Sequence, residues 1–138
     1  MRIIKYNRCQ LPKNILDGFA PEIISGEGEN YIVLHDENNV VGIIEYTIRD
    51  FCWWSGIEIK KEYQRRGYGK ALVRSFIDEI KREGIDLIAG DVLIESKYKI
   101  DKILENMKKE GVIKDYNHND PFGDYWASKR GPLHIYLK

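Results

Sequence analysis

The chain has 138 residues, a length that suits one domain with its own core, and we expect a single domain over residues 1–138. Its 22 basic and 22 acidic residues give a formal net charge of zero, which argues against a global field that would recruit nucleic acid or an anionic membrane. Cys9 and Cys52 lack metal-type or redox-type spacing, and we expect reduced thiols in a cytoplasmic protein with neither a leader nor a membrane segment.

The first thirty residues are predicted to contain a strand, a helix and a turn. Residues 1–6 have an apolar, β-rich centre that favours a strand. Pro12 is tolerated at a helix start, and we expect a helical segment over about 13–24, with a break or a second short helix at Pro21. The stretch 25–30 is rich in glycine and polar residues and is typical of a turn.

Three segments in the middle of the chain predict an antiparallel meander. The apolar runs at 31–35, 40–48 and 52–60 favour strands, because they are rich in β-branched and aromatic residues and are separated by turn residues. The third strand leads directly to a stretch with two closely spaced glycines.

A helix is predicted after this stretch, over 69–83, because apolar residues recur there at helical spacing and Gly84 ends the run. The segment 85–94 favours a strand. We expect it to lie parallel to the strand at 52–60, because a crossover helix connects the two.

The last third of the chain is predicted to contain one helix and two strands. The helix covers 99–109, and the strands at 112–114 and 133–137 are separated by an aromatic loop over 115–125. The whole order of elements predicts an α/β (α+β) fold with a single mixed, mostly antiparallel sheet, a central parallel pair and flanking helices.

The stretch 64–72 has the sequence QRRGYGKAL and joins a predicted strand to a predicted helix. A helix N-terminus presents unpaired N–H groups and the positive end of its dipole, and nearby glycines allow an anion to approach the backbone. The dinucleotide-binding fingerprint does not fit because its third glycine is absent, and Lys70-Ala71 lacks the Lys-Ser/Thr pair of a P-loop. We therefore expect a phosphate or pyrophosphate site.

This stretch, preceded by Ile57-x-Ile59, resembles the acyl-CoA-binding motif of the GNAT superfamily of N-acetyltransferases, Q/R-x-x-G-x-G/A. The order of elements from 31 to 111 also resembles that family's sheet and helices. The resemblance implies acetyl-CoA as co-substrate, with its pyrophosphate on the backbone of 65–70 and its pantetheine arm along 57–59, where two parallel strands splay apart. The residues that it implies for this role are Ile57, Glu58, Ile59, Arg65, Arg66, Gly67, Tyr68, Gly69 and Lys70.

Two glutamates are candidates for the general base. Glu45 and Glu58 lie on strands that should pair, and mutual repulsion on a shared face would raise the pKa of one of them. The alternative is that both are ordinary solvent-facing side chains.

The general acid is harder to place. The family's usual tyrosine, four residues before the glycine that ends the second helix, corresponds to Met107. Tyr98 is a candidate in its place, unless it is only a surface residue, and water is a further source of the proton.

For the acceptor amine, we expect a surface built from aromatic and acidic residues, because aromatics supply rigid contact area and carboxylates attract a cation. The candidates are Trp53, Trp54, Asp124 and Trp126, with core packing as the alternative for the tryptophans. No cluster of His, Cys and carboxylate residues has metal-ligand spacing, and we expect no metal.

The sequence thus predicts an N-acetyltransferase that moves an acetyl group directly from acetyl-CoA to a primary amine on a small molecule or peptide. A non-catalytic acyl-CoA-binding module is the alternative, because Met107 replaces the usual tyrosine. A nucleic-acid binder is disfavoured by the zero net charge. Exposed aromatic residues leave a homodimer open.

Overall fold

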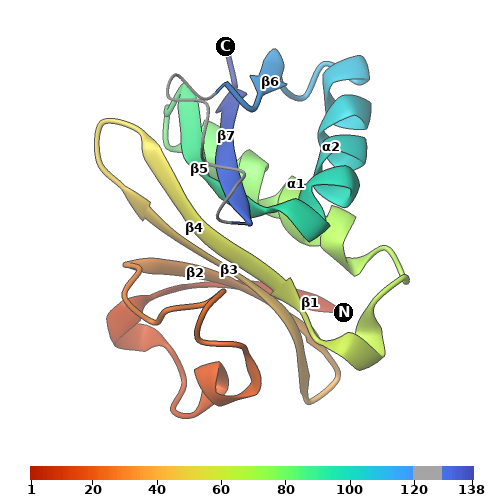
Figure 1. The fold of residues 1–138 in the computed structure, drawn as a ribbon. Helices are drawn as coiled ribbons and strands as arrows, with labels where there is room; N and C mark the ends of the chain where they lie inside the picture. The colour runs from red at the N-terminus through yellow and green to blue at the C-terminus, as the bar shows by residue number, and fades with distance from the viewer. Residues whose placement is uncertain (120–128) are drawn as a thin grey trace.

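The structure is a computed structural model and describes residues 1–119 and 129–138 (Figure 1). In these residues seven strands form one sheet in the order β1-β2-β3-β4-β5-β7-β6. The strands are β1 (Arg2–Asn7), β2 (Asn30–Asp36), β3 (Asn39–Ile48), β4 (Cys52–Ile59), β5 (Leu87–Leu93), β6 (Asp115–Asn117) and β7 (Arg130–Tyr136).

Neighbouring strands run antiparallel except β4 and β5, which are parallel. The crossover between them contains the helix α1 (Tyr68–Arg82), and α2 (Ile94–Lys109) follows β5. Short 3-10 helices occur as η1 (Arg8–Gln10), η2 (Ile15–Gly18) and η3 (Lys61–Tyr63). The predicted fold class, a mixed sheet with a central parallel pair and flanking helices, is confirmed.

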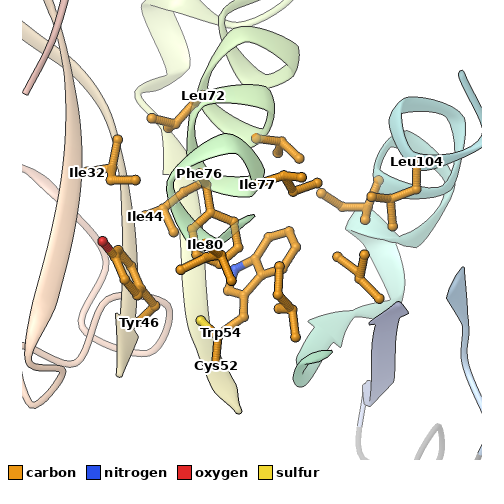
Figure 2. Close-up of a cluster of buried hydrophobic side chains, with 14 of the residues drawn as sticks. Ile32, Ile44, Tyr46, Cys52, Trp54, Leu72, Phe76, Ile77, Ile80 and Leu104 are labelled. Atoms are coloured by element: carbon orange, nitrogen blue, oxygen red, sulfur yellow. The ribbon is translucent and has the colours of Figure 1, made fainter. Parts of the chain in front are cut away.

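The two faces of the sheet have different covers (Figure 1). On one face α1 and α2 pack over the strands, because α1 presents the apolar residues Leu72, Val73, Phe76, Ile77 and Ile80 at helical spacing. Figure 2 shows Leu72, Phe76, Ile77 and Ile80 of α1 with Trp54 of β4 beside them. On the other face residues 11–29, between η1 and β2 and called here the N-terminal segment, pack against β2 and β3.

The predicted helix over 13–24 is wrong. The structure has only η2 and turns there, and Asn14 adopts a left-handed φ of 68°. Tertiary contacts outweigh local propensity here. Ile15, Phe19 and Ile24 are buried against the sheet, and the Ala20 amide bonds a carboxylate of β4 instead of a carbonyl one turn earlier.

Two other element boundaries differ from the prediction. Helix α2 begins at Ile94, five residues earlier than predicted, directly after the end of β5. The strand predicted at 112–114 forms instead at Asp115–Asn117, where it pairs with β7. Among the described residues, none of the helices has both the length and the apolar character that crossing a membrane requires.

Candidate active site

The loop between η3 and α1 has a backbone suited to an anion. Gly67 caps α1 with a φ of 79°, and Arg65 also lies in the left-handed region with a φ of 66°. Left-handed residues at alternate positions turn successive N–H groups toward a common side, and the first turn of α1 adds its own unpaired N–H groups. The loop can therefore bind phosphate oxygens through its backbone.

Several side chains of this loop hold it against the sheet. Gln64 donates from Nε2 to the Ile59 carbonyl oxygen at 2.9 Å, and Tyr68 donates to Asp36 Oδ2 at 3.2 Å. Arg66 stacks over the ring of Tyr63 with its Cζ 5.7 Å from the ring centroid. Arg65 and Lys70 are exposed, which leaves their charges accessible to a ligand.

Beside this loop, β4 and β5 separate. They pair only through three residue pairs, from Cys52–Ile88 to Trp54–Gly90, and beyond Trp54 the two strands diverge (Figure 1). The edge of β4 from 55 to 59 is therefore not paired with β5. Such an edge presents N–H and C=O groups that can pair with a peptide-like ligand.

A pocket of about 30 Å³ lies where the strands diverge. Gly56 and Ile57 of β4 line one side and Asp91, Val92 and Leu93 of β5 the other. The remaining lining residues come from the N-terminal segment, the inner part of β4, α2 and β7: they are Ile23, Trp54, Ser96, Ile100 and Arg130.

This pocket receives side chains from both faces of the sheet. Val92 and Ile100 belong to the core under the helices. Asp91 is next to Val92 on β5 and faces the opposite side, because side chains alternate along a strand. On that side the N-terminal segment borders the pocket: a Cβ on Gly56 would lie 2.1 Å from the Ile23 carbonyl oxygen, so only glycine fits there. The pocket thus lies between β4 and β5 and is lined from both faces of the sheet.

Arg130, the first residue of β7, fixes the N-terminal segment at this point. Its Nη2 donates to the carbonyl oxygen of Glu22. Burial raises the pKa of the Asp91 carboxyl above its ordinary value of 3.8, and the positive charge of Arg130 lowers it in part. A carboxyl with a raised pKa in a pocket is a candidate for proton transfer.

Glu45 is fully buried, at 0% exposure, and its two oxygens accept five hydrogen bonds. Ser25 donates from its backbone N and its Oγ to Oε1, at 3.1 and 2.9 Å. The other three donors reach Oε2: they are the N–H groups of Gly26 and Gly28 and the Tyr31 hydroxyl, the last at 2.6 Å. Glu45 is therefore a buried carboxylate whose oxygens are occupied by protein donors, and it does not line the β4–β5 pocket, which argues against its prediction as the base.

Glu58 lies on the same face as Glu45, because it pairs with Ile43 on β3. Both of its oxygens accept from the Ala20 N–H, at 3.2 and 3.3 Å. Burial is the largest cause that raises the pKa of Glu58, and Glu22 raises it further, while the Ala20 N–H and Lys60 lower it. The pKa of Glu58 is therefore raised, but by burial and Glu22 and not by the predicted repulsion from Glu45.

The second helix does not carry a tyrosine at the pocket. Met107 is 1% exposed and packs in the core with Leu104. Tyr98 is 78% exposed. Its side chain therefore faces solvent from the first turns of α2.

The two tryptophans predicted for the acceptor surface differ in exposure. Trp53 is 43% exposed, whereas Trp54 is 1% exposed and packs edge-on against Phe76 at a centroid distance of 5.4 Å (Figure 2). Trp54 is therefore a core residue that closes the pocket from within. Asp124 and Trp126 lie outside the described residues.

Sequence reasoning missed Asp91 and Arg130. A carboxylate inside the apolar run 87–93 was the one available signal for Asp91, because a charge in a buried strand requires a reason. Arg130 joins the site only through the position of β7. A larger hollow of about 280 Å³ beside Lys60, at the β2–β3 turn, shares no residue with the β4–β5 pocket.

Comparisons with known proteins agree with this geometry. A family model described as the acetyltransferase (GNAT) family matches residues 2–96. A search of curated protein sequences gave no match. The similar solved structures are 12–17% identical in sequence to this chain and therefore show the fold alone.

One such structure is the ribosomal-protein-S18-alanine N-acetyltransferase from Escherichia coli, with 15% identity, a TM-score of 0.69 and coverage of 99% of this chain and 95% of that one. An IAA acetyltransferase from Bacillus cereus has 16% identity, a TM-score of 0.67 and 99% coverage of both chains. The N-acetylglutamate synthase from Neisseria gonorrhoeae, solved with coenzyme A and N-acetyl-glutamate, has 12% identity, a TM-score of 0.67 and coverage of 100% and 36%. Because the family model spans most of the sequence and the sheet diverges beside the glycine loop, the chain belongs to the acetyltransferase (GNAT) family.

Proposed function

We propose that the protein transfers an acetyl group from acetyl-CoA directly to a primary amine on a small molecule or peptide. The observation that carries this proposal is the pocket between β4 and β5, lined from both faces of the sheet. A thioester held along β4 would present its carbonyl carbon in this pocket. An amine could reach that carbon from the face covered by the N-terminal segment without a covalent enzyme intermediate.

The donor would be held at two places. The pyrophosphate would bind the backbone N–H groups of 65–70, where left-handed residues and the start of α1 favour an anion. Arg65 and Lys70 are exposed beside them and would add charge-assisted contacts. The pantetheine arm would pair with the open edge of β4, and the N. gonorrhoeae enzyme, solved with coenzyme A, supports a donor of this class.

The reaction needs a group that takes a proton from the amine. The nitrogen attacks the thioester carbonyl carbon, the C–S bond breaks, CoA leaves as a thiolate, and the amine proton passes to a carboxylate. We assign this role to Asp91, which lines the pocket and whose pKa is raised by burial. Glu58 is the second candidate, on the same side of the sheet but hydrogen-bonded to Ala20.

The thiolate then needs a proton. Met107 occupies the core where the family's usual tyrosine would stand, and Tyr98 faces solvent. Water is therefore the proposed proton source, because a thiolate is a weakly basic leaving group. Because Met107 stands in α2 at the position of the family's usual tyrosine, a second candidate function is also favoured, an acyl-CoA-binding module without catalysis.

One experiment distinguishes the two functions. Acetyl-CoA is titrated into the full chain by calorimetry, and release of free thiol is followed with alkyl amines, peptides and aminoglycosides as acceptors. Binding with thiol release that depends on an amine supports the transferase. Binding without release for any acceptor supports the module, and absence of binding overturns both.

The location is also proposed as cytoplasmic. Cys9 and Cys52 are free thiols in the structure, one exposed and one buried. Unpaired cysteines are typical of a reducing compartment.

A further inference from the structure

The helix-side end of the β4–β5 pocket is closed by three buried apolar side chains. Trp54, Val92 and Ile100 line the pocket and are at most 5% exposed. The Trp54 indole is fixed by its edge-on contact with Phe76. These three side chains, called here the pocket wall, belong to the packed core, where side chains occupy defined rotamers and yield little.

The space in front of the pocket wall is small. A cavity needs about 10–15 Å³ to hold one water molecule. A pocket of about 30 Å³ therefore holds only two or three atomic groups as large as a water molecule. An acetyl group offers a methyl and a carbonyl oxygen. A butyryl group adds two methylenes and exceeds a space of this size.

Ile100 is the member of the pocket wall best suited to set this limit. Trp54 and Val92 lie on the strands that form the pocket, whereas Ile100 reaches it from α2. Its side chain can therefore be shortened without changing the strands along which the donor lies.

We propose that the pocket wall, with Ile100 as its selectivity-determining residue, restricts the acyl group on CoA to about the size of acetyl. The inference rests on the proposed function, since it assumes that the acyl end of the donor enters this pocket. It adds which donors are rejected and which side chain rejects them. An apolar pocket distinguishes one extra methylene by about 10- to 200-fold when the methylene does not fit.

Binding of the donor alone tests the inference, and no acceptor is needed. CoA, acetyl-CoA, propionyl-CoA and butyryl-CoA are titrated into the wild-type chain by calorimetry. We expect butyryl-CoA to bind at least about tenfold more weakly than acetyl-CoA. If space were available, each methylene would instead strengthen binding by about fourfold.

Two variants on the same helix locate the selectivity. Ile100→Ala removes a side chain from the pocket wall, and Leu104→Ala removes a buried side chain one turn later that does not line the pocket. We expect Ile100→Ala to reduce the acetyl-to-butyryl preference by about tenfold and Leu104→Ala to leave it unchanged. Ile100→Val is the conservative replacement if the alanine variant does not fold, with a smaller shift in the same direction.

The outcomes separate this inference from the proposed function. Equal or increasing affinity with chain length in the wild type, or equal shifts in the two alanine variants, overturns the inference and leaves the transferase standing. If no acyl-CoA binds at all, the proposed function and the inference fail together.

Discussion

The carbonyl oxygen of Trp54 lies 2.3 Å from the position that a Cβ atom on Gly90 would occupy. These two residues form the last pair between β4 and β5 before the strands diverge. A backbone atom, unlike a flexible side chain, cannot move away without moving its strand. The glycine therefore allows the final contact at the point where the pocket begins.

Gly90→Ala should destabilise the protein, because the added methyl group would displace β4. We expect the free energy of unfolding to fall by about 1–3 kcal/mol, as in other overpacked sites. Urea unfolding measures this change. Gly69→Ala is the matched control, because a Cβ there meets nothing nearer than Ile59 at 3.9 Å, and its stability should be maintained.

Gly69→Ala should instead weaken donor binding. The methyl group would occupy the space through which we propose that the pyrophosphate approaches the backbone of α1. We expect the affinity for acetyl-CoA to fall about tenfold, which corresponds to about 1.4 kcal/mol. Calorimetric titration gives the affinity. Gly84→Ala, at a left-handed φ of 76° on the far end of α1, should show the reverse, with lower stability and unchanged affinity. Unchanged affinity in Gly69→Ala would rule out the pyrophosphate assignment.

Glu45→Gln should reduce stability through the N-terminal segment. An amide can accept at only one of its two terminal atoms, so donors that now bond both carboxylate oxygens would lose partners. We expect a loss of about 2–4 kcal/mol in the free energy of unfolding. Glu29→Gln serves as the control, because Glu29 is an exposed partner of Arg49 and contributes little. Equal stability of the two variants would contradict the role of Glu45.

Glu58 should make stability depend on pH in a defined direction. Its pKa in the folded chain is raised above the ordinary 4.5, chiefly by burial, so the folded state holds this proton more tightly than the unfolded state. The stabilisation is complete below the unfolded pKa and is lost as pH rises through the folded pKa. Glu58→Gln removes this dependence, so the variant should gain stability relative to wild type across that interval. Urea unfolding at a series of pH values tests it, and a constant difference would refute it.

Asp91→Asn should abolish most of the transfer activity if Asp91 is the base. Removal of a general base costs about 10²–10⁴ in rate, and we expect the loss in kcat rather than in acetyl-CoA affinity. In the wild type, activity should rise with pH through a pKa above the ordinary value for aspartate, and the variant should lose that rise. A larger loss of kcat in Glu58→Gln would assign the base to Glu58 instead.

The elements with strong local patterns were predictable. The helix expected over 69–83 forms at Tyr68–Arg82, because its apolar spacing and the glycine that follows are local signals. The meander was also predictable, because its apolar runs and the turn residues between them are local signals. The segment 13–24 was not, because its conformation depends on the burial of Ile15, Phe19 and Ile24 against the sheet and on a carboxylate of β4 that accepts from Ala20.

The site was predictable only in part. The glycine loop is contiguous in sequence, so its position at the start of α1 followed from the motif. The pocket is assembled from residues far apart along the chain, such as Ile23, Asp91 and Arg130, and no local pattern brings these together. Glu45 also could not be recognised as a buried anchor, because most of its donors come from a turn 17 to 20 residues earlier.

The short pairing between β4 and β5 divides the sheet into two groups of strands with few hydrogen-bonded pairs between them. Strands β1 to β4 form one block and β5, β7 and β6 another, and only three residue pairs join them along this line. A donor lying against the free edge of β4 would take the place of the missing strand pairing and couple the two blocks. Binding of the donor would then reduce the motion of the two blocks relative to each other, including strands that do not contact the donor.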